Sequence, residues 1–362
     1  MRILLLNTFP VWGGDEKWTI NVGVGLKAKG HQVTISCPPN GPTERHALEN
    51  GLDVFPFHIG PDIAFWKIPP LKKYLKDNKI EVLLCVQNRD VKVGALAGRI
   101  AKVPAIFARQ GLDTIKRRID HKIPFTKFVD GIITNTRSIK QLYDSYGWFS
   151  NEFIHVVWDG LALPEEIKKI DLHEEFGLTV GSKVIVGTGR LANQKRFDLL
   201  IKVAEIAKQN KRNWSFVIVG TGDLENELKA LAKKKGVDHI IKFIGFRDDV
   251  LSIMKSANLF VLSSDSEGMS NALREAMAVG LPCVATNVFG VEELFGHDNN
   301  GLSVKKGDYK SIYDAINKIF ENSELEIRLR DNAAELIRTS FTINRMIDQI
   351  EALFLKQLDV KK

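Results

Sequence analysis

Short apolar segments alternate with longer amphipathic segments along most of the chain. In the first half, runs rich in Val, Ile and Leu predict strands at Ile3–Leu6, Val33–Cys37, Val54–Phe57, Val82–Val86, Ala105–Ala108, Gly131–Thr134 and Phe153–Val157. Apolar residues at helical spacing predict helices between them, at Glu16–Lys29, Leu71–Asn78, Val91–Ala101 and Ser138–Tyr146. This alternation indicates a parallel sheet covered by helices on both faces.

The same alternation restarts after a polar, proline-bearing stretch at 163–181. It predicts strands at Val184–Val186, Ser215–Val219, Ile240–Phe243, Leu259–Leu262 and Cys283–Ala285, and helices at Arg196–Gln209, Asp223–Lys235, Asp248–Ala257 and Asn271–Val279. We therefore expect an α/β protein with two Rossmann-like, doubly wound domains, at 1–162 and 163–341. Open sheets of this type bind ligands at the carboxyl ends of their strands, so two such domains facing each other would enclose a ligand cleft.

The segment 342–362 forms a separate amphipathic helix. Its apolar side chains recur at a spacing of three to four residues, at Ile343, Met346, Ile347, Ile350, Leu353, Phe354 and Leu358. One continuous apolar stripe of this kind needs a partner to pack against.

Composition excludes several classes of protein. The chain of 362 residues is 44% hydrophobic and 26% charged, which is typical of globular domains, and no run of eighteen apolar residues is present. The start, MRILLLNTFP, has an apolar core of only four residues, so we interpret it as a buried strand rather than a signal peptide. Cys37, Cys85 and Cys283 show no CxxC or Cys–His spacing, which argues against disulfides and metal clusters and favours buried thiols in a reducing cytoplasm.

The chain has a formal net charge of +7, and part of this charge is local. Between 109 and 127 lie Arg109, Lys116, Arg117, Arg118, Lys122 and Lys127, against Asp113 and Asp120. Such a run attracts phosphates or anionic lipid, and it predicts peripheral contact with the inner face of a membrane. The alternative is a solvated basic face. We expect no nucleic-acid partner.

The passage 263–282 carries the most chemical information. The predicted strand Leu259–Leu262 ends in small polar residues, and a helix begins near Ser270, a favoured N-cap residue. The amides from Gly268 to Asn271 would then form an anion site at the helix N-terminus. Glu267 lies in the loop and Glu275 about one turn into the helix. Phosphate would repel these carboxylates, so sugar and ribose hydroxyls suit them better. The alternative is that both are solvated residues that flank a packed helix.

Two Glu separated by seven residues, within EGMSNALREAMAVGLPCVAT, resemble the signature of the retaining GT-B glycosyltransferases, specifically glycosyltransferase family 4. The resemblance implies a GT-B fold and transfer of a sugar, with retention, from a nucleotide-diphosphate sugar to a sugar or lipid-linked acceptor. It implies that Glu267 faces the donor sugar and Glu275 binds ribose hydroxyls. It also implies that the segment 342–362 crosses back to the first domain. Such enzymes act in cell-surface polysaccharide, lipopolysaccharide or glycolipid synthesis.

A second matching element follows the first strand of the second domain, where Gly189 and Arg190 precede Lys195. Positive charges there suit a diphosphate. The resemblance implies that Arg190 and Lys195 stabilise the departing nucleotide diphosphate, a task that would otherwise need a metal. We therefore expect Glu267, Arg190 and Lys195 to be catalytic, with no metal and no cofactor. Two surface cations on a loop are the alternative.

Glycine-rich turns complete the expected donor site. Gly220 and Gly222 form a GxG turn, and Glu225 stands where a dehydrogenase would need a third glycine. The resemblance also implies donor contacts from a loop in the first domain and from the segment that borders the base. The expected donor-binding residues are Gly13, Gly14, Gly189, Gly220, Gly222, Phe246, Arg247, Gly268, Met269, Ser270, Asn271 and Glu275.

One position departs from the family pattern. Many members carry a His that faces the sugar, and this chain has Gln110 there, beside Arg109. Gln can donate a hydrogen bond but does not titrate near neutral pH. We assign Arg109 and Gln110 to the acceptor and sugar side, and the replacement for the His stays open. A nucleotide-sugar epimerase and a non-catalytic sugar-nucleotide-binding protein are the alternative functions. The sequence leaves open the base, sugar, acceptor, linkage and oligomeric state.

Overall fold

The computed structural model describes residues 1–60, 64–112 and 114–361. Asp113, one of the two acidic residues within the basic run at 109–127, lies outside the described residues. The chain divides into two compact units. Unit 1 contains residues 1–160 and 342–362, and unit 2 contains residues 161–341.

Unit 1 is built on a parallel sheet of seven strands in the order β3-β2-β1-β4-β5-β6-β7. All seven strands predicted for the first half are present. The inner strand β1 pairs with β2 on one side and β4 on the other, and its residues Ile3 to Leu6 are fully buried, which explains its unbroken apolar run. The strands are β1 (Arg2–Leu6), β2 (Gln32–Cys37), β3 (Asp53–Pro56), β4 (Val82–Cys85), β5 (Ala105–Gln110), β6 (Gly131–Thr134) and β7 (Ile154–Val156).

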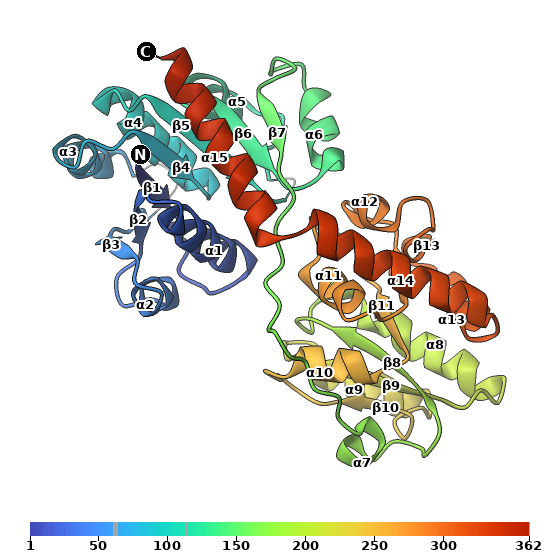
Figure 1. Ribbon diagram of the computed structural model, residues 1–362. Coiled ribbons are helices and arrows are strands. Elements are labelled where there is room, and N and C mark those ends of the chain that lie inside the picture. The colour runs from blue at the N-terminus through green and yellow to red at the C-terminus, as the bar shows by residue number, and fades with distance from the viewer. Residues whose placement is uncertain (61–63, 113, 362) are drawn as a thin grey trace. The chain divides into compact units, whose positions relative to one another are not determined.

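Helices cover both faces of this sheet (Figure 1). The predicted helix 91–101 begins with a π-helical turn, η2 (Asp90–Ala95), before α4 (Leu96–Ala101). The others are α1 (Gly14–Ala28), α2 (Pro42–Glu49), η1 (Phe65–Lys67), α3 (Ile68–Asp77), α5 (Ile119–Ile123), η3 (Pro124–Phe128), α6 (Arg137–Asp144) and α15 (Ile343–Val360).

The last helix, α15, packs beside α1 against the sheet of unit 1 (Figure 1). Its buried residues join the same core as Ile3 and Leu5 of β1. The two helices approach closely at Gly25, where a Cβ would lie 2.4 Å from Cγ1 of Ile347. Among the described residues, no helix has both the length and the apolar character needed to cross a membrane.

Unit 2 contains a parallel sheet of six strands in the order β10-β9-β8-β11-β12-β13. Five were predicted, and the three-residue edge strand β13 was not. The strands are β8 (Lys183–Thr188), β9 (Trp214–Val219), β10 (Ile241–Phe243), β11 (Leu259–Leu262), β12 (Cys283–Thr286) and β13 (Leu302–Val304). The helices are α7 (Leu172–Phe176), η4 (Asn193–Lys195), α8 (Phe197–Gln209), α9 (Glu225–Lys234), α10 (Val250–Ser256), α11 (Asn271–Ala278), α12 (Val291–Phe295), α13 (Tyr309–Phe320) and α14 (Ser323–Ser340).

Candidate functional site

The candidate site lies at the topological switch point of the sheet in unit 2. Strands β8 and β11 are neighbours there, although they are far apart in the sequence. Their connections run in opposite directions across the sheet, so the loops at their carboxyl ends diverge and leave room for a ligand. Of the residues that the sequence singled out, these two loops, 189–196 and 263–270, carry Gly189, Arg190, Lys195, Glu267, Gly268, Met269 and Ser270.

Lys195 and Glu267 meet directly at this point. The Lys195 ammonium donates to Oε1 of Glu267 at 2.7 Å, and the Ser264 hydroxyl donates to the same oxygen at 2.6 Å. Both charged side chains are largely buried, with exposed fractions of 19% and 11%. The sequence predicted the two residues separately, and the structure brings them into contact.

Further hydrogen bonds fix the two loops against each other. The amide of Asp265 donates to the carbonyl of Gln194 at 2.8 Å, and the Ser263 hydroxyl donates to the carbonyl of Lys195 at 2.7 Å. The Gln194 side-chain amide donates to the carbonyl of Ser266. The backbone on both sides of the Lys195–Glu267 pair is therefore held in place.

Arg190 lies in the same loop as Lys195 and is exposed. Within the described part of the chain, its guanidinium has no ion pair and no side-chain hydrogen bond. This cation is therefore available to an anionic ligand.

The helix α11 begins beside Glu267. The Ser270 hydroxyl accepts from the amide of Leu273 at 3.4 Å, as an N-cap does. The fully buried Arg274 donates to the side chain of Asn271. Gly268 and Met269 are buried just before the cap, and Glu275 is partly exposed one turn into the helix. The predicted helix start near Ser270 is therefore confirmed.

The glycines of this site are required by the packing of the protein itself. Gly189 and Gly220 have φ of +145° and +132°, which favours glycine. A Cβ at Gly220 would lie 2.1 Å from the carbonyl oxygen of Gly189, and one at Gly222 would lie 2.4 Å from that of Leu191. The backbones after β8 and β9 thus touch each other. The packing of the protein therefore requires glycine at these positions, whether or not they contact the donor.

Phe246 and Arg247 differ in how accessible their side chains are to a ligand. Phe246 is 72% exposed, whereas the Arg247 guanidinium binds Asp249 at 2.6 and 2.7 Å and also binds Glu175. The hydrogen bonds that Arg247 donates to Asp249, and then to Glu175, raise the pKa of Arg247. The charge of Arg247 is therefore already compensated within unit 2.

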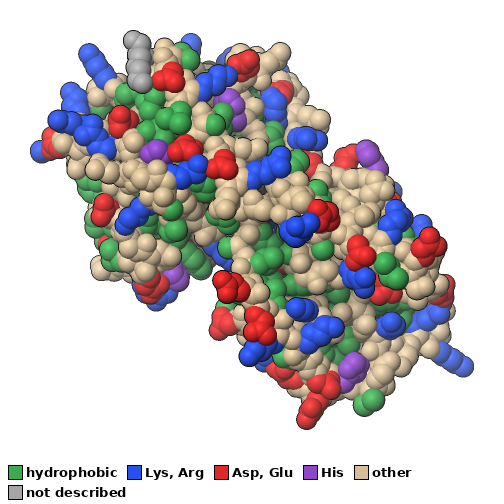
Figure 2. Space-filling model, in the orientation of Figure 1, with side chains coloured by type: hydrophobic (Ala, Val, Ile, Leu, Met, Phe, Trp, Pro, Cys, Tyr) green, Lys and Arg blue, Asp and Glu red, His purple; other side chains and the backbone are tan. Residues whose placement is uncertain are grey.

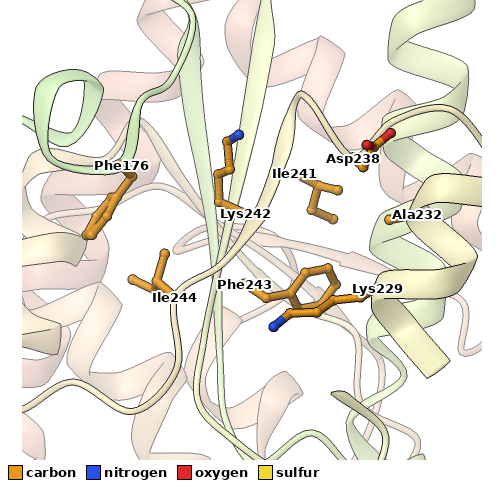
Figure 3. Close-up of a pocket in the computed structure, with 8 residues that line it drawn as sticks. All are labelled: Phe176, Lys229, Ala232, Asp238, Ile241, Lys242, Phe243 and Ile244. Atoms are coloured by element: carbon orange, nitrogen blue, oxygen red, sulfur yellow. The ribbon is translucent and has the colours of Figure 1, made fainter. Parts of the chain in front are cut away.

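A cavity of about 290 Å³ lies at the edge strand β10, two strands away from β8. Figure 3 shows Lys242 and Phe243 of this strand pointing in different directions. The lining residues are Phe176, Lys229, Ala232, Asp238, Ile241, Lys242, Phe243 and Ile244. None of them is among the residues that the sequence singled out.

In unit 1, the predicted glycine-rich loop leads into α1. Gly13 is the N-cap of α1 in an extended conformation, Gly14 is the first helical residue, and both are exposed. The loop follows β1, next to the switch point between β1 and β4. Two exposed glycines there leave the backbone accessible to a ligand.

Arg109 and Gln110 are buried, with exposed fractions of 3% and 2%. The Gln110 amide donates to the carbonyl of Arg109 at 2.7 Å, and the Thr114 hydroxyl donates to the Gln110 carbonyl oxygen. The Arg109 guanidinium binds Asp15 at 2.8 Å and Asp159 at 2.9 Å. Burial opposes its ionisation, but the charges of Asp159 and Asp15 outweigh this effect and raise the pKa of Arg109. Both side chains are thus engaged within unit 1.

No group of three or more His, Cys, Asp or Glu side chains within 1–60, 64–112 and 114–361 could hold a metal ion. Asp265 and Glu267, which have the spacing of a DxD metal motif, bind Arg196 and Lys195 instead. Cys37, Cys85 and Cys283 are free and buried, and burial raises the pKa of Cys37 to about 12.

Sequence reasoning did not single out Arg196, Asp265 or Ser264 as site residues. The signal available was their position, since Arg196 follows Lys195 directly and the other two lie within three residues of Glu267. The partners became visible only in the folded chain.

Comparison with known families matches both units. The family described as "Glycosyl transferases group 1" matches residues 168–336, and "Glycosyltransferase Family 4" matches residues 12–163. The first match contains Lys195, Glu267 and Glu275, and the second contains Gly13 and Gly14.

Individual proteins are similar over nearly the whole chain. An uncharacterized glycosyltransferase of Haemophilus influenzae is 26% identical, over 93% of this chain and 95% of that protein. The Escherichia coli UDP-Gal:alpha-D-GlcNAc-diphosphoundecaprenol alpha-1,3-galactosyltransferase is 25% identical over 98% and 97%. Among solved structures, Anabaena HepE in complex with UDP and glucose has a TM-score of 0.81 at 20% identity, over 98% of this chain and 100% of the other. A Rickettsia africae glycosyltransferase has a TM-score of 0.86 at 17% identity, over 99% and 98%.

Proposed function

The chain belongs to the GT-B glycosyltransferases of family 4, and on that premise we propose that it transfers a sugar, with retention, from a nucleoside-diphosphate sugar to a sugar or lipid-linked acceptor. One observation carries the proposal. A cation and a carboxylate, Lys195 and Glu267, meet at 2.7 Å at the switch point of a doubly wound sheet. The Lys195 ammonium can bind the diphosphate of the donor, and the Glu267 carboxylate can accept hydrogen bonds from sugar hydroxyls.

The charges in unit 2 support a division of roles. Arg190 and Lys195 bind the diphosphate and stabilise the negative charge that develops as the sugar leaves. The amides at the start of α11 add a second anion-binding element. Glu267 accepts hydrogen bonds from the sugar, and Glu275 accepts them from the ribose. Gly189 and Phe246 contribute to the donor pocket.

Retention follows, in this proposal, from transfer on one face of the sugar. The bond between the anomeric carbon and the phosphate oxygen breaks as the acceptor hydroxyl attacks from the same side. The acceptor's proton passes to the departing phosphate oxygen. Arg190 and Lys195 offset the charge on the diphosphate, so the step requires no metal ion.

We propose a UDP-sugar as the donor and a diphosphate-linked lipid as the acceptor. The name of the Escherichia coli relative specifies UDP-Gal and a diphosphoundecaprenol-linked acceptor, and HepE has been crystallised with UDP-glucose. A Rhizobium meliloti relative, 24% identical, is named for lipopolysaccharide core biosynthesis. Synthesis of a cell-surface polysaccharide or lipopolysaccharide is the corresponding process.

A lipid-linked acceptor would bring the enzyme to the anionic inner face of a membrane, on the cytoplasmic side. The cations from Lys116 to Arg118 are exposed and precede α5, where Ile119 and Ile123 are 69% and 47% exposed one turn apart. Exposed cations beside exposed apolar side chains suit a charged lipid surface. Figure 2 shows further Lys and Arg side chains gathered along the edge of unit 1, around α3 and α4.

The test is turnover of UDP-sugars by the purified chain, with and without a polyprenyl-diphosphate-linked acceptor. We expect Lys195→Ala and Arg190→Ala each to lower kcat at least a hundredfold, with EDTA leaving the wild-type rate unchanged. Lys229→Ala, which removes an exposed cation paired with Glu225, is the matched control and should keep full activity.

Four outcomes would count against this function. Near wild-type rates for both variants would remove Arg190 and Lys195 from the mechanism. A strict requirement for a divalent metal would contradict leaving-group stabilisation by the two cations alone. A product that is an epimerised nucleotide sugar, or binding of UDP without any turnover, would favour the epimerase or the non-catalytic binding protein.

A further inference from the structure

Arg196, next to the Lys195–Glu267 pair, has a backbone conformation that its side chain disfavours. Its φ is 51° and its ψ is 41°, in the left-handed region, at the N-cap of α8. Residues with a Cβ rarely adopt this conformation, whereas glycine adopts it freely. The ion pairs of the Arg196 side chain offset the cost of this conformation.

The Arg196 guanidinium binds two carboxylates from different elements. Nε and Nη2 bind the two oxygens of Asp198 at 2.9 and 3.2 Å, and Nη1 binds both oxygens of Asp265 at 3.2 and 3.1 Å. Asp198 lies in the first turn of α8, and Asp265 lies in the loop after β11. The planar guanidinium can bridge two carboxylates in this way because its donors have a fixed geometry.

Two ion pairs thus connect the same two loops. Lys195 binds Glu267, and Arg196 binds Asp265, only two residues before Glu267. Lys195 pairs with Glu267, whereas Arg196 is shared between Asp265 and Asp198. Without Arg196, the charge of Asp265 would be uncompensated next to the site and would attract the Lys195 ammonium away from Glu267. Arg196 therefore stabilises the arrangement in which Lys195 pairs with Glu267.

We propose that Arg196 is a positioning residue for the transfer reaction, which keeps the Lys195 ammonium beside Glu267 by occupying Asp265 and fixing the loop 189–196. This inference rests on the proposed roles of Lys195 and Glu267. Arg196 acts through Lys195 and needs no contact with the donor.

The first experiment compares kcat with a UDP-sugar for three variants. Arg196→Gly removes the guanidinium while suiting the left-handed backbone, and it should lower kcat about tenfold or more. Adding Asp265→Asn to this variant removes the competing carboxylate and should recover at least threefold. Lys211→Gly is the matched control, since Lys211 has φ 53° and is exposed, and it should leave kcat unchanged.

The second experiment repeats Arg196→Gly in a Lys195→Ala background. If Arg196 acts through Lys195, the second substitution has no further effect on kcat, whereas a general structural effect would lower kcat by the same factor as in the wild type. Arg196→Lys serves where the glycine variant is insoluble. A lysine cannot bind two carboxylates with a planar fork, so it should lose about threefold, and Asp265→Asn should restore this loss.

Wild-type kcat in Arg196→Gly, absence of recovery by Asp265→Asn, or an undiminished effect in the Lys195→Ala background would each overturn the positioning role. Failure of the proposed function is distinguishable, because the wild-type chain itself would then not turn over UDP-sugars.

Discussion

The guanidinium of Arg109 binds the carboxylate of Asp159 through Nη2, at 2.9 and 3.1 Å to its two oxygens. The same group binds Asp15 next to the glycine-rich loop, and its carbon lies 4.3 Å from the ring centre of Trp18. Asn135 donates to Asp159 as well, at 2.8 Å. Arg109 therefore connects the start of α1 to the end of the first segment of unit 1.

Arg109→Met should destabilise the protein strongly, because it leaves Asp159 buried without its cation. Removing one partner of a buried ion pair costs about 3–5 kcal/mol. Urea unfolding measures the change, and adding Asp159→Asn should recover part of the loss because the uncompensated charge disappears. A stability within about 0.5 kcal/mol of the wild type would contradict this structural role.

Arg109 and Glu267 differ in how much the local sequence reveals about them. The fold was predictable because buried parallel strands such as β1 are unbroken apolar runs, whereas the apolar pattern of β13 is interrupted by the exposed Ser303. Glu267 could be proposed as a site residue because its spacing to Glu275 is a local property of the sequence. The partners of Arg109 lie 94 and 50 residues away in the sequence, so nothing local reveals that its charge is compensated.

Asp90 should make stability depend on pH. Burial, the largest effect, raises the pKa of Asp90 from 3.8 to about 7, against hydrogen bonds from Thr8 and Gln87 that lower it. The folded chain then binds more protons than the unfolded chain between these two values, so the free energy of unfolding falls as the pH rises from about 4 to 7. Asp90→Asn should remove this slope.

The measurement is urea unfolding of wild type and Asp90→Asn between pH 4.5 and pH 8. The variant should be more stable at pH 8 by about 1 kcal/mol or more, since one pKa unit corresponds to about 1.4 kcal/mol. At pH 4.5 the two should be nearly equal. An asparagine can keep the contacts, because its amide can donate to the Thr8 hydroxyl. Parallel curves across the pH range would contradict the raised pKa.

Glu275→Gln should weaken UDP binding more than Glu267→Gln does, because we place Glu275 on the ribose and Glu267 on the sugar, which UDP lacks. Loss of a charged hydrogen bond to the ribose should cost about tenfold in Kd. Glu267→Gln frees the Lys195 ammonium from its counter-charge, so UDP should bind as well as or better than to the wild type. Isothermal calorimetry gives both values, and the reverse order would mean that the two roles are exchanged.

The helix α15 should be essential for the stability of unit 1. Phe354 is fully buried in the core that contains Ile3 and Leu5, so Phe354→Ala should lower the free energy of unfolding by about 3–5 kcal/mol. Leu355→Ala is the control, since Leu355 is 45% exposed and should change stability little. Deleting 342–362 should give insoluble protein. A soluble, active truncation would show that the packing of α15 is dispensable.

The basic run should bind anionic lipid in a salt-dependent manner. Each exposed cation from Lys116 to Arg118 can add about 1 kcal/mol near a charged surface, and added salt screens this attraction. Sedimentation with anionic liposomes should therefore show binding that decreases as salt rises. Replacing all three residues with Gln should abolish most of it and leave the Kd for UDP unchanged. The charge-matched control replaces Lys229, Lys233 and Lys234 of α9 with Gln, which should leave liposome binding intact. Equal partitioning to neutral and anionic liposomes, or to neither, would instead assign the run to a solvated basic face and the acceptor to solution.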